Sequence, residues 1–174
     1  MRAEFVSDER LRLILELLTY ENYLVCCVAL QSGLRINDCL ALEPMQLDKK
    51  TFTITEQKTG KKRRVRLSVQ LRKELRSVAG EYYVFPHRTD PCRHRTRQAV
   101  YCDIRRACKA LRIKEHISPH SLRKHYAVEL LQNGATLDEV KRSLNHESEF
   151  VTLLYALSDK VELQALIKNR AKKG

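Results

Sequence analysis

A change of hydrophobic period between residues 51 and 68 constrains this chain more than any other feature. In TFTITEQKTGKKRRVRLS, Phe52 and Ile54 alternate with threonines, and Val65 and Leu67 alternate with arginines. Strict alternation is typical of a strand with one buried face, and TGKK between the two runs favours a turn. The segment therefore predicts an antiparallel β-hairpin, and the rest of the chain has to pack around a small sheet.

The remainder of the chain has the pattern of helices. Ser7 and the acidic residues after it are typical of a helix N-terminus, and that helix continues through RLRLILELL. A second helix is expected from about Glu21 to Gln31, ending at Gly33. Further helices are expected over residues 69–79, 96–112, 120–132, 137–145, 149–157 and 160–170, and EYYVF (81–85) is a candidate short strand.

The sequence contains no internal repeat and no long linker, and 174 residues suffice for one proper core. We therefore predict one domain over residues 1–174. Its fold class is mainly α with a small antiparallel β-sheet (α+β).

Positive charge dominates the composition. The chain has 33 Lys and Arg against 21 Asp and Glu, a formal charge of +12. This excess favours a polyanionic partner such as nucleic acid, although an inert basic surface has the same composition. No apolar run approaches the ~20 residues of a membrane span, and the N-terminus MRAEFVSDER is charged where a signal peptide is apolar. We expect a cytoplasmic protein without a membrane partner, associated with the nucleoid if it is prokaryotic or encoded by a phage.

The cysteines favour reduced thiols over a disulfide or metal framework. Six are present, with no C-x-x-C pair, at positions 26, 27, 39, 92, 102 and 108. PHRTDPCRHR brings His87, Cys92 and His94 together, but a second ligand cluster is missing from the sequence. We interpret this stretch as a basic loop and expect neither a metal nor a cofactor.

Two short motifs have the chemistry of a phosphate site. In PHSLRKHYA, His120 and Arg123 are three residues apart on a predicted helix, so both project from the same face. In SGLRINDCLAL, Arg35 follows a helix-ending glycine, and Asp38 is placed to orient its guanidinium. Taken singly, the first motif is also typical of a solvated helix start, and the second of a surface ion pair.

Three more residues are candidates. Lys58 lies at the predicted turn QKTGKK, where a lysine is most often only solubilising. His146 ends a predicted helix in SLNH. In the helix that follows, Phe150, Leu153, Leu154 and Leu157 form one apolar stripe, and Tyr155 lies off it. Tyr155 is therefore either a half-buried surface residue or a reactive group.

In order and approximate spacing, these residues resemble the catalytic domain of the tyrosine recombinases, the phage integrase family. The resemblance covers nearly the whole chain, and its most specific parts are HSLRKHYA and the interval from His146 to Tyr155. Asn145 stands where the family usually has glycine. The family also often has a histidine directly after the second arginine, whereas in this chain Lys124 follows Arg123 and His125 comes next. The usual N-terminal core-binding domain is not expected in these residues. The matching positions are Arg35, Lys58, His120, Arg123, His146 and Tyr155.

The resemblance implies a site-specific recombinase (integrase) that acts on double-stranded DNA without metal or ATP. Tyr155 is then the nucleophile, and Arg35 and Arg123 hold the phosphate. His120 either assists proton removal from Tyr155 or hydrogen-bonds the phosphate, and His146 completes the clamp. Lys58 protonates the leaving 5′-oxygen, a role for which Lys61 and Lys62 are alternatives. The C-terminal helix and basic tail, residues 159–174, are implied to dock on another protomer in a DNA-bound tetramer.

Other functions fit parts of the same pattern. A type IB topoisomerase shares the nucleophile and the arginine clamp but reseals the same strand. A DNA-binding module without chemistry requires only the helices and the basic surface. A metal-binding protein would rely on the stretch around Cys92 alone.

Overall fold

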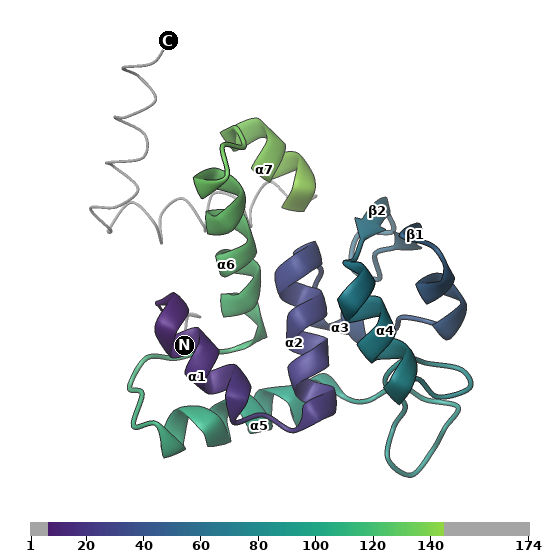
Figure 1. The fold of residues 1–174 in the computed structure, drawn as a ribbon, viewed down its shortest axis with the longest axis horizontal. Coiled ribbons are helices and arrows are strands. Elements are labelled where there is room, and N and C mark those ends of the chain that lie inside the picture. Colours follow the sequence, from purple (N-terminus) through teal and green to yellow (C-terminus); the bar gives the residue numbers. More distant parts are fainter. Residues whose placement is uncertain (1–6, 145–174) are drawn as a thin grey trace. The chain divides into compact units, whose positions relative to one another are not determined.

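The computed structural model describes residues 7–144, which form helices and one two-stranded sheet (Figure 1). The predicted fold class, mainly α with a small antiparallel sheet, is confirmed. The chain divides into two compact units, Met1–Tyr126 and Ala127–Gly174. The elements in chain order are α1 (Asp8–Glu16), α2 (Tyr20–Ser32), α3 (Ile36–Leu40), the 3₁₀ helix η1 (Pro44–Asp48), β1 (Thr51–Thr55), β2 (Lys62–Arg66), α4 (Val69–Val78), α5 (Arg97–Ala110), α6 (Pro119–Gln132) and α7 (Leu137–Leu144).

The predicted hairpin is formed by β1 and β2 in antiparallel register. Phe52 pairs with Val65 and Ile54 with Arg63, and the three apolar side chains of these pairs are buried. The turn closes through Gly60, whose N–H donates to the Glu56 carbonyl at 2.8 Å. Gly60 adopts φ +65°, a left-handed conformation that glycine accepts at little cost.

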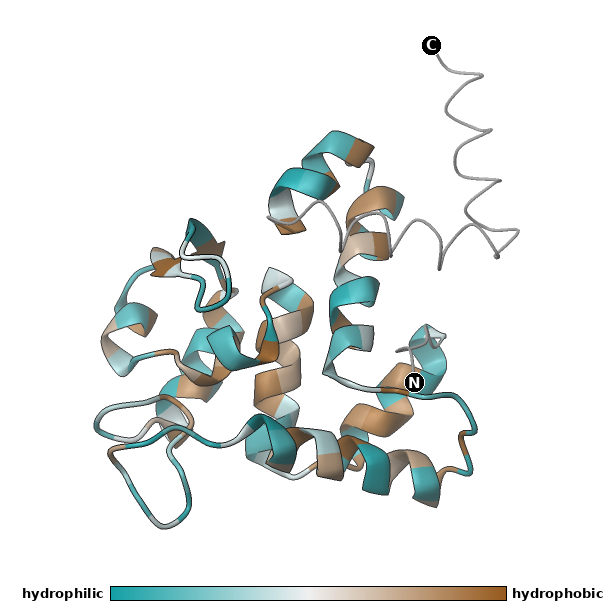
Figure 2. Ribbon diagram, turned by 180° about the vertical axis from the view of Figure 1, so that it is seen from behind, coloured by the Kyte–Doolittle hydropathy of each residue, from teal (hydrophilic) through white to brown (hydrophobic). Residues whose placement is uncertain are grey.

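Helix α2 is the centre of the first unit. It contacts α1, α3, α4, α5 and β2, and its buried residues include Leu24, Val25 and Val28. Figure 2 shows its largely apolar composition. A helix that is apolar on most sides has to be covered on most sides, which explains why the other elements surround α2. It ends, as predicted, at Gly33.

Asp103 of α5 holds the start of α2 in place through hydrogen bonds. Its Oδ2 accepts hydrogen bonds from the Thr19 N–H at 2.9 Å and the Asn22 amide at 2.8 Å. Its Oδ1 accepts from Arg106 Nε at 2.9 Å. Burial raises the pKa of Asp103, but the hydrogen bonds from Asn22, Thr19 and Arg106 outweigh burial and hold the pKa below its ordinary value.

Three features of the first unit differ from the prediction or were missed. Helices α3 and η1, each of five residues, were not predicted because such short helices show no clear period. The candidate strand EYYVF is wrong, because residues 81–85 form no strand. Val84 and Phe85 are consecutive and both buried, and the Val84 N–H donates to the Leu42 carbonyl at 2.8 Å. Val84 and Phe85 thus belong to a loop whose two apolar side chains pack into the core.

In the second unit, the described residues comprise the end of α6, a turn and α7. Gly134 takes φ +94° in the turn. Thr136 and Glu139 then form a reciprocal cap, in which the Thr136 N–H donates to Glu139 Oε2 at 2.6 Å and the Glu139 N–H to Thr136 Oγ1 at 3.2 Å. The predicted helices over 149–157 and 160–170 lie outside the described residues. Within residues 7–144, every helix is too short or too polar to cross a membrane.

Candidate active site

The site is built on the segment in which α2 ends and α3 begins. Gly33 adopts φ +63°, which turns the chain out of α2. A Cβ on Gly33 would overlap the ring of Tyr126, with its Cγ only 2.9 Å away. Glycine is therefore required both by the backbone conformation and by the ring. Arg35 follows as the extended residue before α3, with φ −69° and ψ 148°.

Arg35 is held by a carboxylate from the hairpin. Its Nη1 lies 2.8 Å from Oε2 of Glu56, a residue that comes directly after β1. The Glu56 side chain is fully buried, and that of Arg35 is 9% exposed. Thr59 Oγ1 also donates to Glu56 Oε2, at 2.9 Å. The turn of the hairpin thus fixes the carboxylate, and the carboxylate fixes the arginine.

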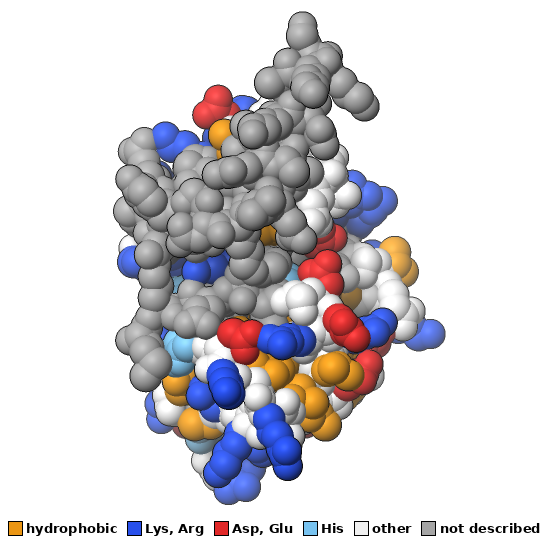
Figure 3. Space-filling view, turned by 90° about the vertical axis from the view of Figure 1, so that its left-hand side faces the viewer, with side chains coloured by type: hydrophobic (Ala, Val, Ile, Leu, Met, Phe, Trp, Pro, Cys, Tyr) orange, Lys and Arg blue, Asp and Glu red, His pale blue; other side chains and the backbone are white. Residues whose placement is uncertain are grey.

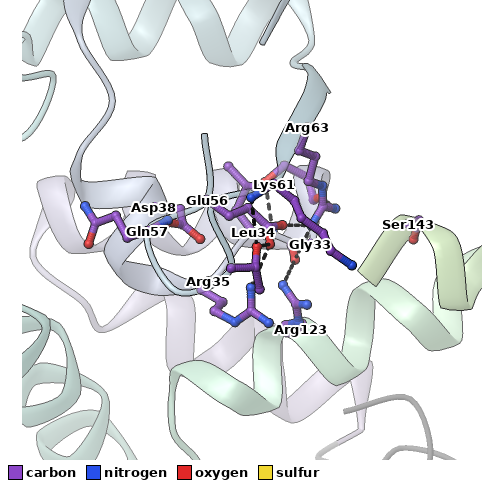
Figure 4. A network of polar contacts seen from close by, with 12 residues as sticks. Gly33, Leu34, Arg35, Asp38, Glu56, Gln57, Lys61, Arg63, Arg123 and Ser143 are labelled. Atoms are coloured by element: carbon purple, nitrogen blue, oxygen red, sulfur yellow. Dashed lines mark hydrogen bonds and ion pairs between the residues drawn. The ribbon is translucent and has the colours of Figure 1, made fainter. Parts of the chain in front are cut away.

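Arg63 of β2 joins the hairpin to the end of α2 (Figure 4). Its Nη1 lies 3.3 Å from Glu56 Oε1 and donates to the Gly33 carbonyl at 3.3 Å. Its Nη2 donates to the Ser32 carbonyl. These carbonyls belong to the last turn of α2, where backbone oxygens lack partners within the helix and attract cations.

Arg123 reaches the same carbonyl from α6. Its Nη1 donates to Gly33 O at 2.7 Å, and the residue is only 6% exposed. Figure 4 shows Arg35 and Arg123 next to each other beside the Gly33–Arg35 segment. Two guanidinium groups from distant parts of the sequence are thus brought together, each anchored by an oxygen that the fold supplies.

Two carboxylates accompany the three arginines. Burial raises the pKa of Glu56, but hydrogen bonds from Thr59 and Arg63 and the charges of Arg35 and Arg63 outweigh burial, so the pKa is lowered and Glu56 is ionised at neutral pH. Burial raises the pKa of Asp38; the Gln57 N–H, which donates to Asp38 Oδ1 at 2.9 Å, opposes this. Three guanidinium groups against two carboxylates leave a net positive site that suits a phosphate.

The structure places the predicted residues as follows. Arg35 and Arg123 lie next to each other beside Gly33. His120 lies exposed on the first turn of α6, one turn before Arg123. Lys58 lies exposed in the turn between β1 and β2, next to the residue that Asp38 anchors. The positions of His146 and Tyr155 lie outside the described residues.

Glu56 and Arg63 were not predicted, although the sequence contains a signal for both. In each strand, every second residue faces the core, as Phe52 and Ile54 do in the first and Val65 in the second. Glu56 and Arg63 continue these two inward series. A glutamate and an arginine at inward positions of the two halves of a hairpin indicate a buried ion pair, whereas alternation with Val65 and Leu67 alone assigns the arginines of the second strand to its polar face.

The stretch around Cys92 forms a loop that is held by local contacts. Pro86 and His94 form an isolated bridge, and the His94 ring meets Tyr83 edge to face, with centroids 5.4 Å apart. The Cys92 N–H donates to Asp90 Oδ1 at 3.0 Å. Among residues 7–144, no three or more His, Cys, Asp or Glu side chains are grouped so that they can hold a metal ion.

Basic side chains are also abundant away from the arginine network. Figure 3 shows a face on which Lys and Arg side chains gather together with apolar ones, where α1 and α5 lie. The exposed basic residues of α5 and the loop after it are Arg97, Arg106, Lys109, Arg112 and Lys114. Such a surface favours a polyanionic partner.

Comparison with known proteins gives consistent results. The model of the phage integrase family matches residues 4–162. The probable integrase/recombinase YoeC of Bacillus subtilis is 29% identical over 157 residues, which cover 84% of this chain and 83% of YoeC. Tyrosine recombinase XerC of Mesorhizobium japonicum is 30% identical over 151 residues, covering 82% of this chain and 48% of XerC.

The fold has solved counterparts as well. The crystal structure of XerA recombinase superimposes with a TM-score of 0.75 at 20% identity and covers 95% of this chain and 63% of the XerA chain. The present chain therefore spans about half of XerC and somewhat under two thirds of XerA.

Proposed function

Because this chain belongs to the phage integrase family, we propose that it is a site-specific recombinase that cleaves and rejoins DNA strands through a 3′-phosphotyrosyl intermediate. The observation that supports this most directly is the pairing of Arg35 and Arg123 beside Gly33. Both arginines were identified from sequence motifs as phosphate ligands, and the described fold brings them into one buried network.

The two arginines prepare the phosphate for attack. A phosphodiester carries a negative charge that repels a nucleophile, and a tyrosine hydroxyl with a pKa near 10 is a poor nucleophile at neutral pH. Guanidinium groups on the non-bridging oxygens neutralise this charge and stabilise the additional charge of the pentacoordinate transition state. Arg35 and Arg123 are already held by Glu56 and the Gly33 carbonyl, so little reorganisation is needed when DNA binds.

The other residues handle protons and the covalent bond. Tyr155 attacks the phosphorus, and the 5′-oxygen leaves, so that the phosphate becomes a diester between the DNA 3′-end and the tyrosine. His120 assists removal of the Tyr155 proton, and His146 completes the contacts to the phosphate. Lys58, carried by the hairpin turn, gives a proton to the 5′-oxygen. Attack by a 5′-hydroxyl from a second strand reverses the step and reseals the backbone.

Covalent trapping tests this proposal. The protein is incubated with nicked duplexes and supercoiled plasmid, denatured in SDS and examined for a protein–DNA adduct. We expect an adduct in the wild type and none in Tyr155→Phe, because the bridging oxygen is missing. Arg123→Ala should form it about 10²–10³ times more slowly, the usual cost of one lost charge-stabilising donor.

Tyr82→Phe is the matched control, because this tyrosine is 49% exposed and lies in the loop after α4. It should react like the wild type. A Tyr155→Phe adduct of normal yield would contradict the nucleophile assignment. Salt-sensitive binding without any adduct would favour a DNA-binding module without chemistry.

We also propose that the active assembly is a DNA-bound tetramer in which residues 159–174 dock on a neighbouring protomer. A chain truncated after Ser158 should then bind DNA but fail to form the higher assembly in native gels. A truncated chain that assembles normally would refute the docking. Exchange of strands between two sites, as opposed to relaxation of one plasmid, separates recombination from topoisomerase activity.

A further inference from the structure

We propose that Glu56 is a positioning residue of the active site, which sets the orientation of Arg35 toward the phosphate and couples it to the hairpin that carries Lys58. This inference rests on the proposed function. It concerns a residue outside the six motif positions.

The carboxylate of Glu56 lies in the interior of the first unit. Glu56 is fully buried, and an ionised carboxylate is stable there only if its oxygens are paired. Both are used: Oε2 accepts from Arg35 at 2.8 Å and from Thr59 at 2.9 Å, and Oε1 from Arg63 at 3.3 Å. Loss of the negative charge would leave two guanidinium groups close together without the anion between them.

Glu56 also restricts the orientation of the Arg35 side chain. A guanidinium group is planar. A short hydrogen bond from one of its nitrogens to a fixed oxygen therefore restricts the directions in which its other N–H groups can donate. Glu56 is itself fixed, because its N–H donates to the Lys61 carbonyl at 3.0 Å and its carbonyl accepts from the Gly60 N–H at 2.8 Å. Arg35 is thus oriented by a rigid turn.

Glu56 is also connected to Arg123 through hydrogen bonds. Arg63 links Glu56 to the Gly33 carbonyl, which is also the acceptor for Arg123. Glu56, Arg63 and Gly33 therefore form one path between the two phosphate ligands. Glu56 also begins the turn that carries Lys58. A change at Glu56 can therefore alter the relative placement of Arg35, Arg123 and Lys58.

The main test is single-turnover cleavage of a nicked duplex by Glu56→Gln at saturating protein. The amide keeps the size of the side chain but loses the charge and one acceptor. We expect cleavage to slow by up to about 100-fold, the effect of a small misplacement of catalytic groups, while DNA affinity changes less than about threefold.

Asp103→Asn is the matched control. Asp103 is also a buried carboxylate that accepts from an arginine, a threonine and an asparagine, but it lies at the start of α2. Both variants should lower the thermal midpoint, and only Glu56→Gln should slow cleavage per folded molecule. Equal cleavage by the two variants would overturn the inference.

A double variant separates positioning from a general loss of structure. If Glu56 acts through Arg35, then Glu56→Gln should add little to the slowing that Arg35→Lys already causes, whereas fully multiplicative effects would contradict this coupling. If Glu56→Gln does not fold, Thr59→Val replaces it, since it removes the hydroxyl that donates to Glu56 Oε2 and that also accepts from the Lys61 N–H at 3.3 Å. Thr59→Val should slow cleavage in the parent and not in Arg35→Lys, and unchanged cleavage in the parent would overturn the inference.

Cleavage by the wild type distinguishes failure of the proposed function from failure of the role of Glu56. Absence of a Tyr155-dependent adduct in the wild type overturns the proposed function and this inference with it. An adduct that forms equally fast in the wild type and in Glu56→Gln overturns the inference alone.

Discussion

At the scale of single residues, Gly33 both sets the backbone conformation at the end of α2 and anchors Arg123. Its φ of +63° ends α2, its missing Cβ leaves room for the Tyr126 ring, and its carbonyl accepts from Arg123 at 2.7 Å. A substitution there affects both stability and the arginine that we assign to the phosphate.

We predict that Gly33→Ala destabilises the protein by more than Gly60→Ala. Both glycines have nearly the same φ, +63° and +65°, so both substitutions impose the left-handed strain of about 1–2 kcal/mol. Only Gly33 adds an overlap with Tyr126, because nothing lies within 4 Å of a Cβ at Gly60. Urea denaturation measures the difference, and equal losses in the two variants would show that the ring moves aside without cost.

Asp103 gives a pH dependence of known sign. Its pKa is lowered in the folded protein, so near its ordinary pKa of 3.8 the unfolded chain binds more protons. Its contribution to stability is therefore complete above that pH and is lost as the pH falls through the lower pKa of the folded state.

We predict that the gap in unfolding free energy between the wild type and Asp103→Asn narrows from pH 7 to pH 3. Denaturation at a series of pH values tests this. A gap that stays constant with pH would mean that the carboxyl has the same pKa in both states.

Residues that stand within compact motifs can be proposed as site candidates from the sequence alone. Arg35 and Arg123 were predicted because each stands in a recognisable local pattern. Glu56 and Arg63 were missed because their role depends on the register of the hairpin: Arg63 of β2 pairs with Ile54, and Glu56 follows directly after β1 in the same inward series. His146 and Tyr155 stay predictions.

At the scale of elements, the end of α5 carries a local strain. Arg112 follows the helix with φ +54° and is the non-glycine residue with positive φ among residues 7–144. The Ile113 N–H donates to the Cys108 carbonyl at 2.9 Å, as in a helix end normally closed by glycine.

We predict that Arg112→Gly raises the stability of the protein by about 1 kcal/mol, because glycine adopts this conformation without the steric cost of a Cβ. Arg112→Ala is the control, since it removes the same charge and keeps the Cβ. Thermal denaturation of both variants should show a gain for glycine alone. A similar gain in both would indicate that charge, and not conformation, is responsible.

Long periodic elements were predicted and short ones were not. The hairpin and the helices from α1 to α7 that extend over eight or more residues follow from period and capping signals. Helices α3 and η1 are too short for a period to develop. EYYVF has the composition of a strand, but its two buried residues are adjacent, and composition alone does not show whether a partner strand is available.

At the scale of the whole molecule, a charge of +12 dominates the interaction with DNA that we propose. Family membership was predicted from six positions distributed from Arg35 to Tyr155 and is confirmed by a match over residues 4–162. A pattern distributed over so much of a chain specifies a fold well, because its spacing constrains most of the elements between the motifs. The arrangement of one domain over residues 1–174 stays a prediction.

We predict that DNA binding weakens steeply with salt. The logarithm of the association constant should fall linearly with the logarithm of salt concentration, with a slope of about −0.9 for each phosphate neutralised. Titrations at several salt concentrations, monitored by fluorescence anisotropy, give the slope. A binding constant that is independent of salt would contradict a mainly electrostatic contact with the backbone.

The oxygen that anchors Arg123 belongs to the main chain, and this has an evolutionary consequence. No codon change can delete the Gly33 carbonyl, whereas one nucleotide change can replace the Glu56 carboxylate that anchors Arg35. A point mutation can therefore remove the anchor of Arg35 directly, but not the anchor of Arg123. A lineage that loses Glu56 has to find another acceptor for Arg35, while every descendant that keeps the bend at the end of α2 inherits the anchor of Arg123.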